Sequence, residues 1–160
     1  MSAASSRDEG PRDEWGTRAL VTETAAELLR RLHGDHGPLM FHQSGGCCDG
    51  SAPMCYPDGD FVIGDRDVLL GRVDVGGDVP VVPVWISGSQ YAAWSHTQLI
   101  IDVVPGRGAG FSLEAPTGQR FLTRSRVIPP DRLGELPDPL TGADVEAGVA
   151  LPAAYAPVSG

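Results

Sequence analysis

Glycine and proline are spaced so closely along this chain that they limit which elements it can form. The 160 residues include 21 glycines and 14 prolines, and turn signals such as Gly37-Pro38 and Gly76-Gly77 separate its apolar runs. Both residue types interrupt helices and strands, so we expect short elements joined by many turns. A small β-rich body fits this pattern better than a helix bundle, and the length suits one domain.

Short runs rich in aliphatic and aromatic residues predict the strands. They cover residues 19–21, 39–42, 68–73, 81–86, 97–104, 111–114 and 119–127. Pro83 lies inside one of these runs and has no backbone N–H to donate. The sequence therefore predicts that this strand lies at a sheet edge or contains a bulge.

One segment has the spacing of a helix. Thr22 is a suitable N-cap, apolar residues recur at positions 25, 28, 29 and 32, and the run ends at His33-Gly34. This pattern predicts a helix of about three turns with one buried face.

The two ends of the chain differ in composition from its middle. Residues 1–16 are small, charged and unpatterned, which predicts a disordered tail. Residues 129–160 are rich in proline, alanine and glycine, which predicts a second tail that docks in part. The expected domain is residues 17–128.

The charge balance argues against several classes of partner. With 12 basic and 21 acidic residues the net charge is -9, which opposes binding to nucleic acid or to an anionic membrane. Residues 1–14 lack the apolar region of a signal peptide, and no apolar stretch is long enough to span a bilayer, so we expect a cytoplasmic protein. Arg120, Arg124 and Arg126 alternate along a predicted strand, where they form a solvated face or dock an acidic partner.

All three cysteines lie in one short segment, Ser44 to Cys55 (SGGCCDGSAPMC), and His42 precedes it by two residues. An odd cysteine count does not suit a disulfide scaffold, and in a reducing cytosol such a cluster indicates metal or redox chemistry. Glycine lets the backbone adopt the turns that would bring the thiols together. The predicted metal ligands are Cys47, Cys48, Cys55 and His42.

The ligand types narrow the choice of metal. Soft thiolates select iron–sulfur clusters, zinc or Cu(I). Three thiolates and one imidazole would complete a four-coordinate zinc site, although the CxxC spacing typical of zinc is missing. A homodimer that pools its cysteines would have enough ligands for a cluster. For His42 the competing interpretation is a hydrogen-bonded structural histidine.

Two other functions remain open at this point. The cysteines could act without metal, one attacking an electrophile as a thiolate and a second resolving the adduct, in a thiol redox or aldehyde-reactive protein. They could also simply pack in the core of a cofactor-free binding module. No acid or base partner is identifiable by spacing, so we do not expect an enzyme and assign no catalytic residue.

The core of the chain, Phe41 to Arg126, carries four long motifs: FHQSGGCCDGS followed by MC, HTQLIIDVVPGRG, GFSLE and RFLTRSR. These motifs closely resemble a bacterial family known as domain-of-unknown-function family 779. The resemblance implies no established activity. Genes of that family often lie beside genes for aldehyde dehydrogenases, so the resemblance implies an aldehyde dehydrogenase as a client.

A more distant resemblance is to the HesB-like A-type iron–sulfur carriers. It rests on residues 19–22 with the helix that follows, on the turn at residues 44–50, and on GFSLE at residues 110–114. The resemblance implies a mainly β (α+β) fold, a small β-sandwich of short mixed strands with one N-terminal helix. It also implies an accessory protein that binds iron or an iron–sulfur species, with zinc as the alternative.

This chain departs from the carrier pattern near its C-terminus. HesB-like carriers have a Cys-Gly-Cys motif where this chain has Gln119 to Arg124. Only the loop cysteine, at Cys47 or Cys48, corresponds to a carrier ligand. Cys55 and the other adjacent cysteine would have to replace the missing pair.

Overall fold

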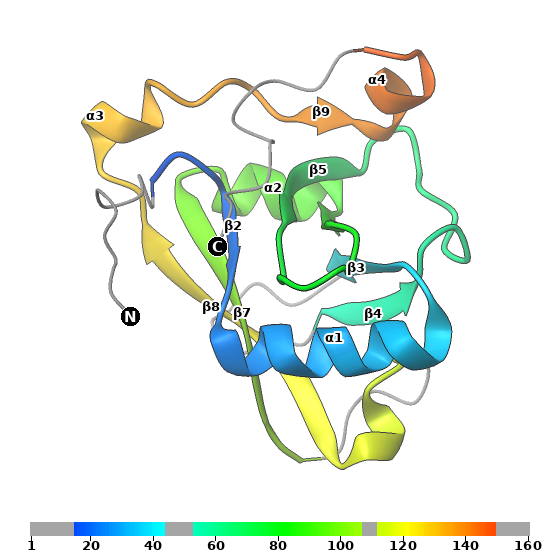
Figure 1. Ribbon diagram of the computed structural model, residues 1–160. Coiled ribbons are helices and arrows are strands. Elements are labelled where there is room, and N and C mark those ends of the chain that lie inside the picture. Colours follow the sequence, from blue (N-terminus) through cyan, green and yellow to red (C-terminus); the bar gives the residue numbers. More distant parts are fainter. Residues whose placement is uncertain (1–14, 44–52, 107–111, 150–160) are drawn as a thin grey trace.

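Two β-sheets share one apolar core. Figure 1 shows the arrangement of their strands. The computed structural model describes residues 15–43, 53–106 and 112–149. One sheet has the strand order β2-β7-β8, formed by β2 (Ala19–Val21), β7 (Thr97–Pro105) and β8 (Gln119–Val127). β2 pairs with β7 in parallel, and β8 pairs with β7 in antiparallel along its whole length.

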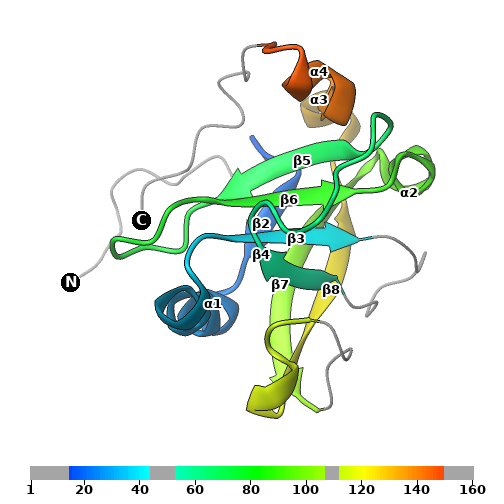
Figure 2. The same cartoon turned by 90° about the vertical axis from the view of Figure 1, so that its right-hand side faces the viewer.

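The second sheet has the order β4-β3-β6-β5-β9. Its strands are β3 (Leu39–Gln43), β4 (Met54–Pro57), β5 (Val68–Val73), β6 (Val82–Ile86) and β9 (Leu140–Thr141). β3 and β6 are parallel, whereas the other neighbours are antiparallel. Figure 2 shows that β3, β6 and β5 run across the direction of β7 and β8. The predicted mainly β, α+β fold with short mixed strands is confirmed.

The predicted N-terminal helix is confirmed, but it ends one turn later than expected. α1 (Glu23–His36) begins where the Thr22 hydroxyl accepts a hydrogen bond from the Ala25 amide at 3.2 Å. Gly34 does not end it. The helix stops at Gly37, whose φ of 79° is a left-handed conformation that glycine adopts without strain.

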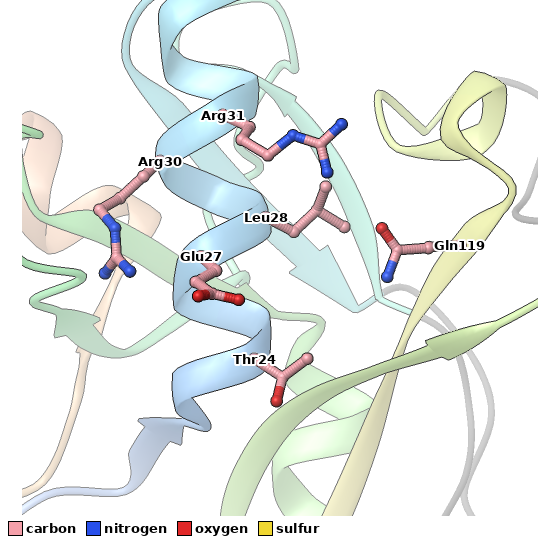
Figure 3. A pocket seen from close by; sticks show the side chains of 6 residues that line it. All are labelled: Thr24, Glu27, Leu28, Arg30, Arg31 and Gln119. Atoms are coloured by element: carbon pink, nitrogen blue, oxygen red, sulfur yellow. The ribbon is translucent and has the colours of Figure 1, made fainter.

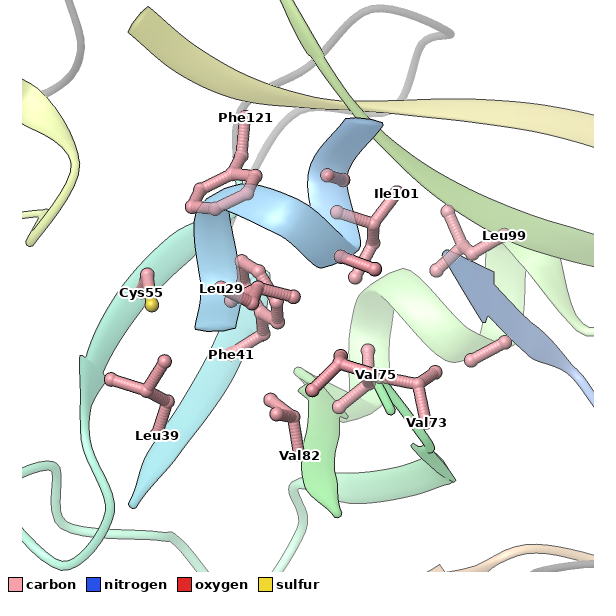
Figure 4. Packing of buried hydrophobic residues seen from close by; sticks show 14 of the residues in the cluster. Leu29, Leu39, Phe41, Cys55, Val73, Val75, Val82, Leu99, Ile101 and Phe121 are labelled. Carbon is pink, nitrogen blue, oxygen red and sulfur yellow. The ribbon is translucent and has the colours of Figure 1, made fainter. Parts of the chain in front are cut away.

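The core lies between the sheets and α1. Its largest cluster combines Leu29 and Leu32 of α1 with Phe41 of β3, Ile101 of β7 and Phe121 of β8 (Figure 4). A smaller cluster of Met40, Leu69 and Trp85 lies on the other face of the five-stranded sheet. The alternation of side chains along β3 places neighbouring residues in different clusters.

The expected edge position of Pro83 is wrong, because β6 lies inside its sheet between β3 and β5. Proline is tolerated there because the pairing of β3 with β6 begins only at Val84, so Pro83 pairs with Arg72 of β5 alone. The irregularity lies in the neighbouring strand, between Leu69 and Gly71. The bulge is therefore close to the proline but not in its own strand.

The segment after residue 129 contains regular structure. α3 (Pro130–Leu133) is followed by β9 and then by α4 (Gly142–Glu146), and β9 pairs with β5 at Val68 and Leu69. The sequence also gave no sign of α2 (Gly88–Trp94), which Ser87 caps. No helix among the described residues is long and apolar enough to cross a membrane.

Candidate functional site

β3 and β4 hold the two ends of the cysteine segment in one antiparallel ladder. Phe41 pairs with Cys55, and His42 pairs with Met54. Between these strands lie residues 44–52, which are outside the described residues and include the predicted ligands Cys47 and Cys48. The described part of the candidate site is therefore the pair of strands at the base of this segment.

Cys55 is a core residue. Its side chain is 0% exposed and belongs to the large apolar cluster, near Phe41 and Phe121 (Figure 4). Those two rings meet edge to face with centroids 5.0 Å apart. Burial, and after it the negative charge of Glu114, raise the pKa of the Cys55 thiol far above its ordinary value. Because the thiolate is both the ligand and the nucleophile, this environment suits neither role.

His42 lies on the opposite face of the same sheet. Its Nε2 is 3.2 Å from the Asp67 Oδ2, and that oxygen also accepts a hydrogen bond from the Gly64 amide at 2.8 Å. The imidazole ring lies 4.3 Å from the ring of Phe61. Since Cys55 points into the large cluster, these two predicted ligands do not converge in this arrangement. His42 therefore contacts a carboxylate and an aromatic ring on that face.

A buried polar network holds β4 to the chain after β7. The Cys55 amide donates to the Ser112 Oγ at 2.8 Å, and the Ser112 hydroxyl donates to the carboxylate of Glu114. The second carboxylate oxygen accepts from the Phe121 amide at 3.2 Å, and the Leu113 amide donates to the Cys55 carbonyl at 3.0 Å. Glu114 is 1% exposed, so these hydrogen bonds replace the ones that its carboxylate would otherwise accept from water.

This network was not predicted from the sequence, which instead indicated a strand at residues 111–114. Residues 112–114 form turns that lead into a 3-10 helix, η1 (Ala115–Thr117), while Phe111 lies outside the described residues. A hydroxyl and a carboxylate two residues apart in an apolar segment were the available signal. Each needs a polar partner when it is buried.

Nothing in the described part of the chain forms a metal site by itself. Within residues 15–43, 53–106 and 112–149, no group of three or more His, Cys, Asp or Glu side chains could hold a metal ion.

Two hollows on the surface contain none of the predicted ligands. A groove of about 540 Å³ lies between α1 and the start of β8, where Arg31 and Gln119 flank Leu28 (Figure 3). Arg30 at its side is bound to Glu23 at 2.9 Å. A smaller hollow of about 290 Å³ lies over Trp85 on the outer face of the five-stranded sheet. Neither contains a thiol.

Comparison with known proteins identifies a family but no activity. A family model described as "Domain of unknown function (DUF779)" matches residues 28–127, which is more than half of the 160-residue chain. No curated protein and no solved structure matches the chain. This match includes the motifs noted in the sequence, and the chain belongs to the DUF779 family.

Proposed function

We propose that this chain is a small accessory protein that binds a metal through its cysteine-rich segment, with iron or an iron–sulfur species preferred and zinc as the alternative. One observation supports this proposal most. β3 and β4 pair as far as His42 and Met54, so a rigid ladder brings both ends of the segment with Cys47 and Cys48 together. A ligand loop supported by ordered strands loses less conformational entropy when it binds a metal.

The surroundings of the other two predicted ligands shift the proposal toward Cys47 and Cys48. Cys55 is enclosed by apolar side chains, and His42 is already in contact with Asp67. Two thiolates per chain leave a four-ligand site incomplete. We therefore propose that a second copy of the chain, or a partner protein, supplies the remaining ligands.

The client protein is a separate part of the proposal. The neighbourhood of genes in this family favours an aldehyde dehydrogenase, acting in the cytoplasm. The likeness to HesB-like carriers, including their fold, remains part of this proposal and supports the choice of iron. This chain lacks the C-terminal cysteine pair of those carriers. A corresponding metal site would therefore take its ligands from the cysteine-rich segment.

Metal analysis of the full chain tests the proposal. The protein is purified without oxygen, its metal content is measured, and its spectrum is recorded. A bound cluster is expected to absorb between roughly 320 and 450 nm. Cys47→Ser and Cys48→Ser should each lose most of the metal, whereas Cys55→Ala, the matched control, should keep the same metal content per folded chain.

Two results would refute this assignment. If both loop variants retain metal, neither cysteine is a required ligand. If the wild-type chain is colourless and free of metal while its thiols react quickly, the metal-free thiol function is the better account.

A further inference from the structure

The outer face of the sheet β2-β7-β8 differs in chemistry from the rest of this acidic chain. Ile101 of β7 and Phe121 of β8 are fully buried in the core cluster. Successive side chains of a strand point to opposite faces. The residues directly before and after Ile101 and Phe121 therefore lie on the outer face. There Arg124 is exposed, and Ile100 and Asp102 are half-buried.

Three of the chain's 12 basic residues lie along β8 on this face. Arg120 pairs with Val104 of β7, Arg124 with Ile100, and Arg126 with Gln98. The net charge of the chain is -9, so this row of three guanidinium groups, with the carboxylate of Asp102 beside Arg124, is a local reversal of sign. Such a patch creates an attractive potential for a negatively charged surface.

Two of these arginines are held in place by their own sheet. The Arg124 Nε donates to the Asp102 Oδ2 at 2.9 Å, and the Arg126 Nε donates to the Gln98 Oε1 at 2.8 Å. The guanidinium of Arg126 also lies 4.3 Å from the ring centroid of Trp15. Anchored side chains lose less entropy when they bind a partner, and a guanidinium matches the geometry of a carboxylate.

Beside the arginines, β7 and β2 place apolar side chains on this face together with Asp102. Leu20 of β2 pairs with Ile100 of β7, and both are half-buried, as is Val104 farther along β7. Arginine beside partly exposed apolar side chains is the composition found in the centre of protein–protein interfaces. We name this surface the arginine face and define it as Leu20, Ile100, Val104, Arg120, Arg124 and Arg126.

We infer that the arginine face is a docking surface for an acidic surface of a partner protein. A second copy of the chain fits poorly, because packing the same face against itself would oppose arginine rows in two chains of net charge -9. A nucleic acid fits poorly for the same reason of overall charge. This inference concerns the sheet β2-β7-β8 and not the sheet that contains β3 and β4, and it stands whether or not the chain binds metal.

A defined peptide tests the inference on the full chain. The probe is an octapeptide of alternating Glu and Val, and its uncharged counterpart has Gln in place of Glu. Binding is followed by NMR, through the arginine Nε–Hε signals and the amides of β7 and β8. We expect the acidic peptide to shift these signals saturably and the Gln peptide to leave them unchanged. Raising the salt from about 0.1 M to about 1 M, which shortens the screening length from about 10 Å to about 3 Å, should weaken the binding.

Two charge reversals provide matched variants. Arg120→Glu changes the arginine face, while Arg31→Glu makes the same change of net charge on α1. We expect the first to weaken binding of the acidic peptide by about fivefold to thirtyfold and the second to have less than about a twofold effect.

Four outcomes would overturn the inference. In the first, the acidic peptide shows no saturable binding, and in the second the two charge-reversal variants lose peptide affinity equally. In the third, a single-stranded oligonucleotide binds more tightly and shifts the same signals. In the fourth, the chain dimerises through this face.

Discussion

Cys55 allows a sharp test, because the structure makes its thiol part of the core. In the double variant Cys47→Ser/Cys48→Ser it is the chain's only thiol. We expect this thiol to resist alkylation while the chain is folded. Its side chain is 0% exposed, and burial followed by the charge of Glu114 raises its pKa, so both access and the reactive thiolate are suppressed.

The folded structure protects the Cys55 thiol from alkylation to an extent set by the free energy of transient opening. Alkylation of a fully buried thiol has to pass through a transiently open state. An opening free energy of about 4 kcal/mol would slow the reaction by roughly 10³-fold relative to the unfolded chain, since each 1.4 kcal/mol is about a factor of ten. The rate should rise to that of the unfolded chain when urea unfolds the protein.

The assay follows iodoacetamide modification by mass spectrometry, with and without urea. In the wild-type chain, peptide mapping reads the rate at Cys55 separately, so a defect in the double variant does not decide the outcome. Modification of folded Cys55 within a few-fold of the unfolded rate would refute its assignment to the core. A second measurement is the stability of Cys55→Ala, which should fall by about 1–2 kcal/mol because a small cavity remains.

Four further changes test the scaffold by urea unfolding. Gly142→Ala should be strongly destabilising, because an added Cβ would lie 2.0 Å from the Gly64 carbonyl oxygen, whereas Gly34→Ala on α1 meets nothing within 4 Å and should gain about 0.5–1 kcal/mol. Glu114→Ala leaves a buried hydroxyl and a buried amide without an acceptor and should cost about 2–4 kcal/mol; a loss below about 0.5 kcal/mol would contradict the network. Burial would raise the pKa of Asp102, but hydrogen bonds from a guanidinium, an amide and a hydroxyl outweigh it and hold the pKa below its ordinary value. The stability that Asp102 adds over Asp102→Asn should be complete above the pKa of the unfolded state and disappear as the pH falls through the folded-state pKa; an advantage that persists in stronger acid would contradict this.

Local patterns were enough to predict most of the regular elements. The spacing of Leu28, Leu29 and Leu32 predicted α1, and the aliphatic run from Thr97 predicted β7, because each pattern depends on residues close together in the chain. Where α1 ends was harder to predict. Either Gly34 or Gly37 could have ended the helix. Only the folded backbone shows that Gly37 is the one with positive φ.

The side-chain directions at the candidate site could not be predicted from spacing. His42 and Cys55 lie near each other in the sequence and on paired strands, yet they point to opposite faces. That outcome depends on which residue of β4 is paired with Phe41. Register depends on how the whole sheet pairs. Proximity along the chain therefore does not show which face of the sheet each candidate ligand occupies.

The polar network at Cys55 was beyond local reasoning for another reason. Ser112 is 57 residues away from Cys55 along the chain, and the hydrogen bond between them exists only after both sheets have formed. The Phe121 amide reaches the Glu114 carboxylate only when β8 lies beside residues 112–114. Buried polar groups can be suspected from a sequence, but their partners depend on the tertiary fold.

The hydrogen bonds at Cys55 also bear on how this protein behaves at high concentration. β4 is the last strand on its side of the five-stranded sheet, and an end strand with open backbone groups recruits strands from other molecules. Here Ser112 and Leu113 already bond the amide and carbonyl of Cys55. At the other end of the sheet, β9 is only two residues long. Among the described residues, this sheet therefore offers little template for edge-to-edge aggregation.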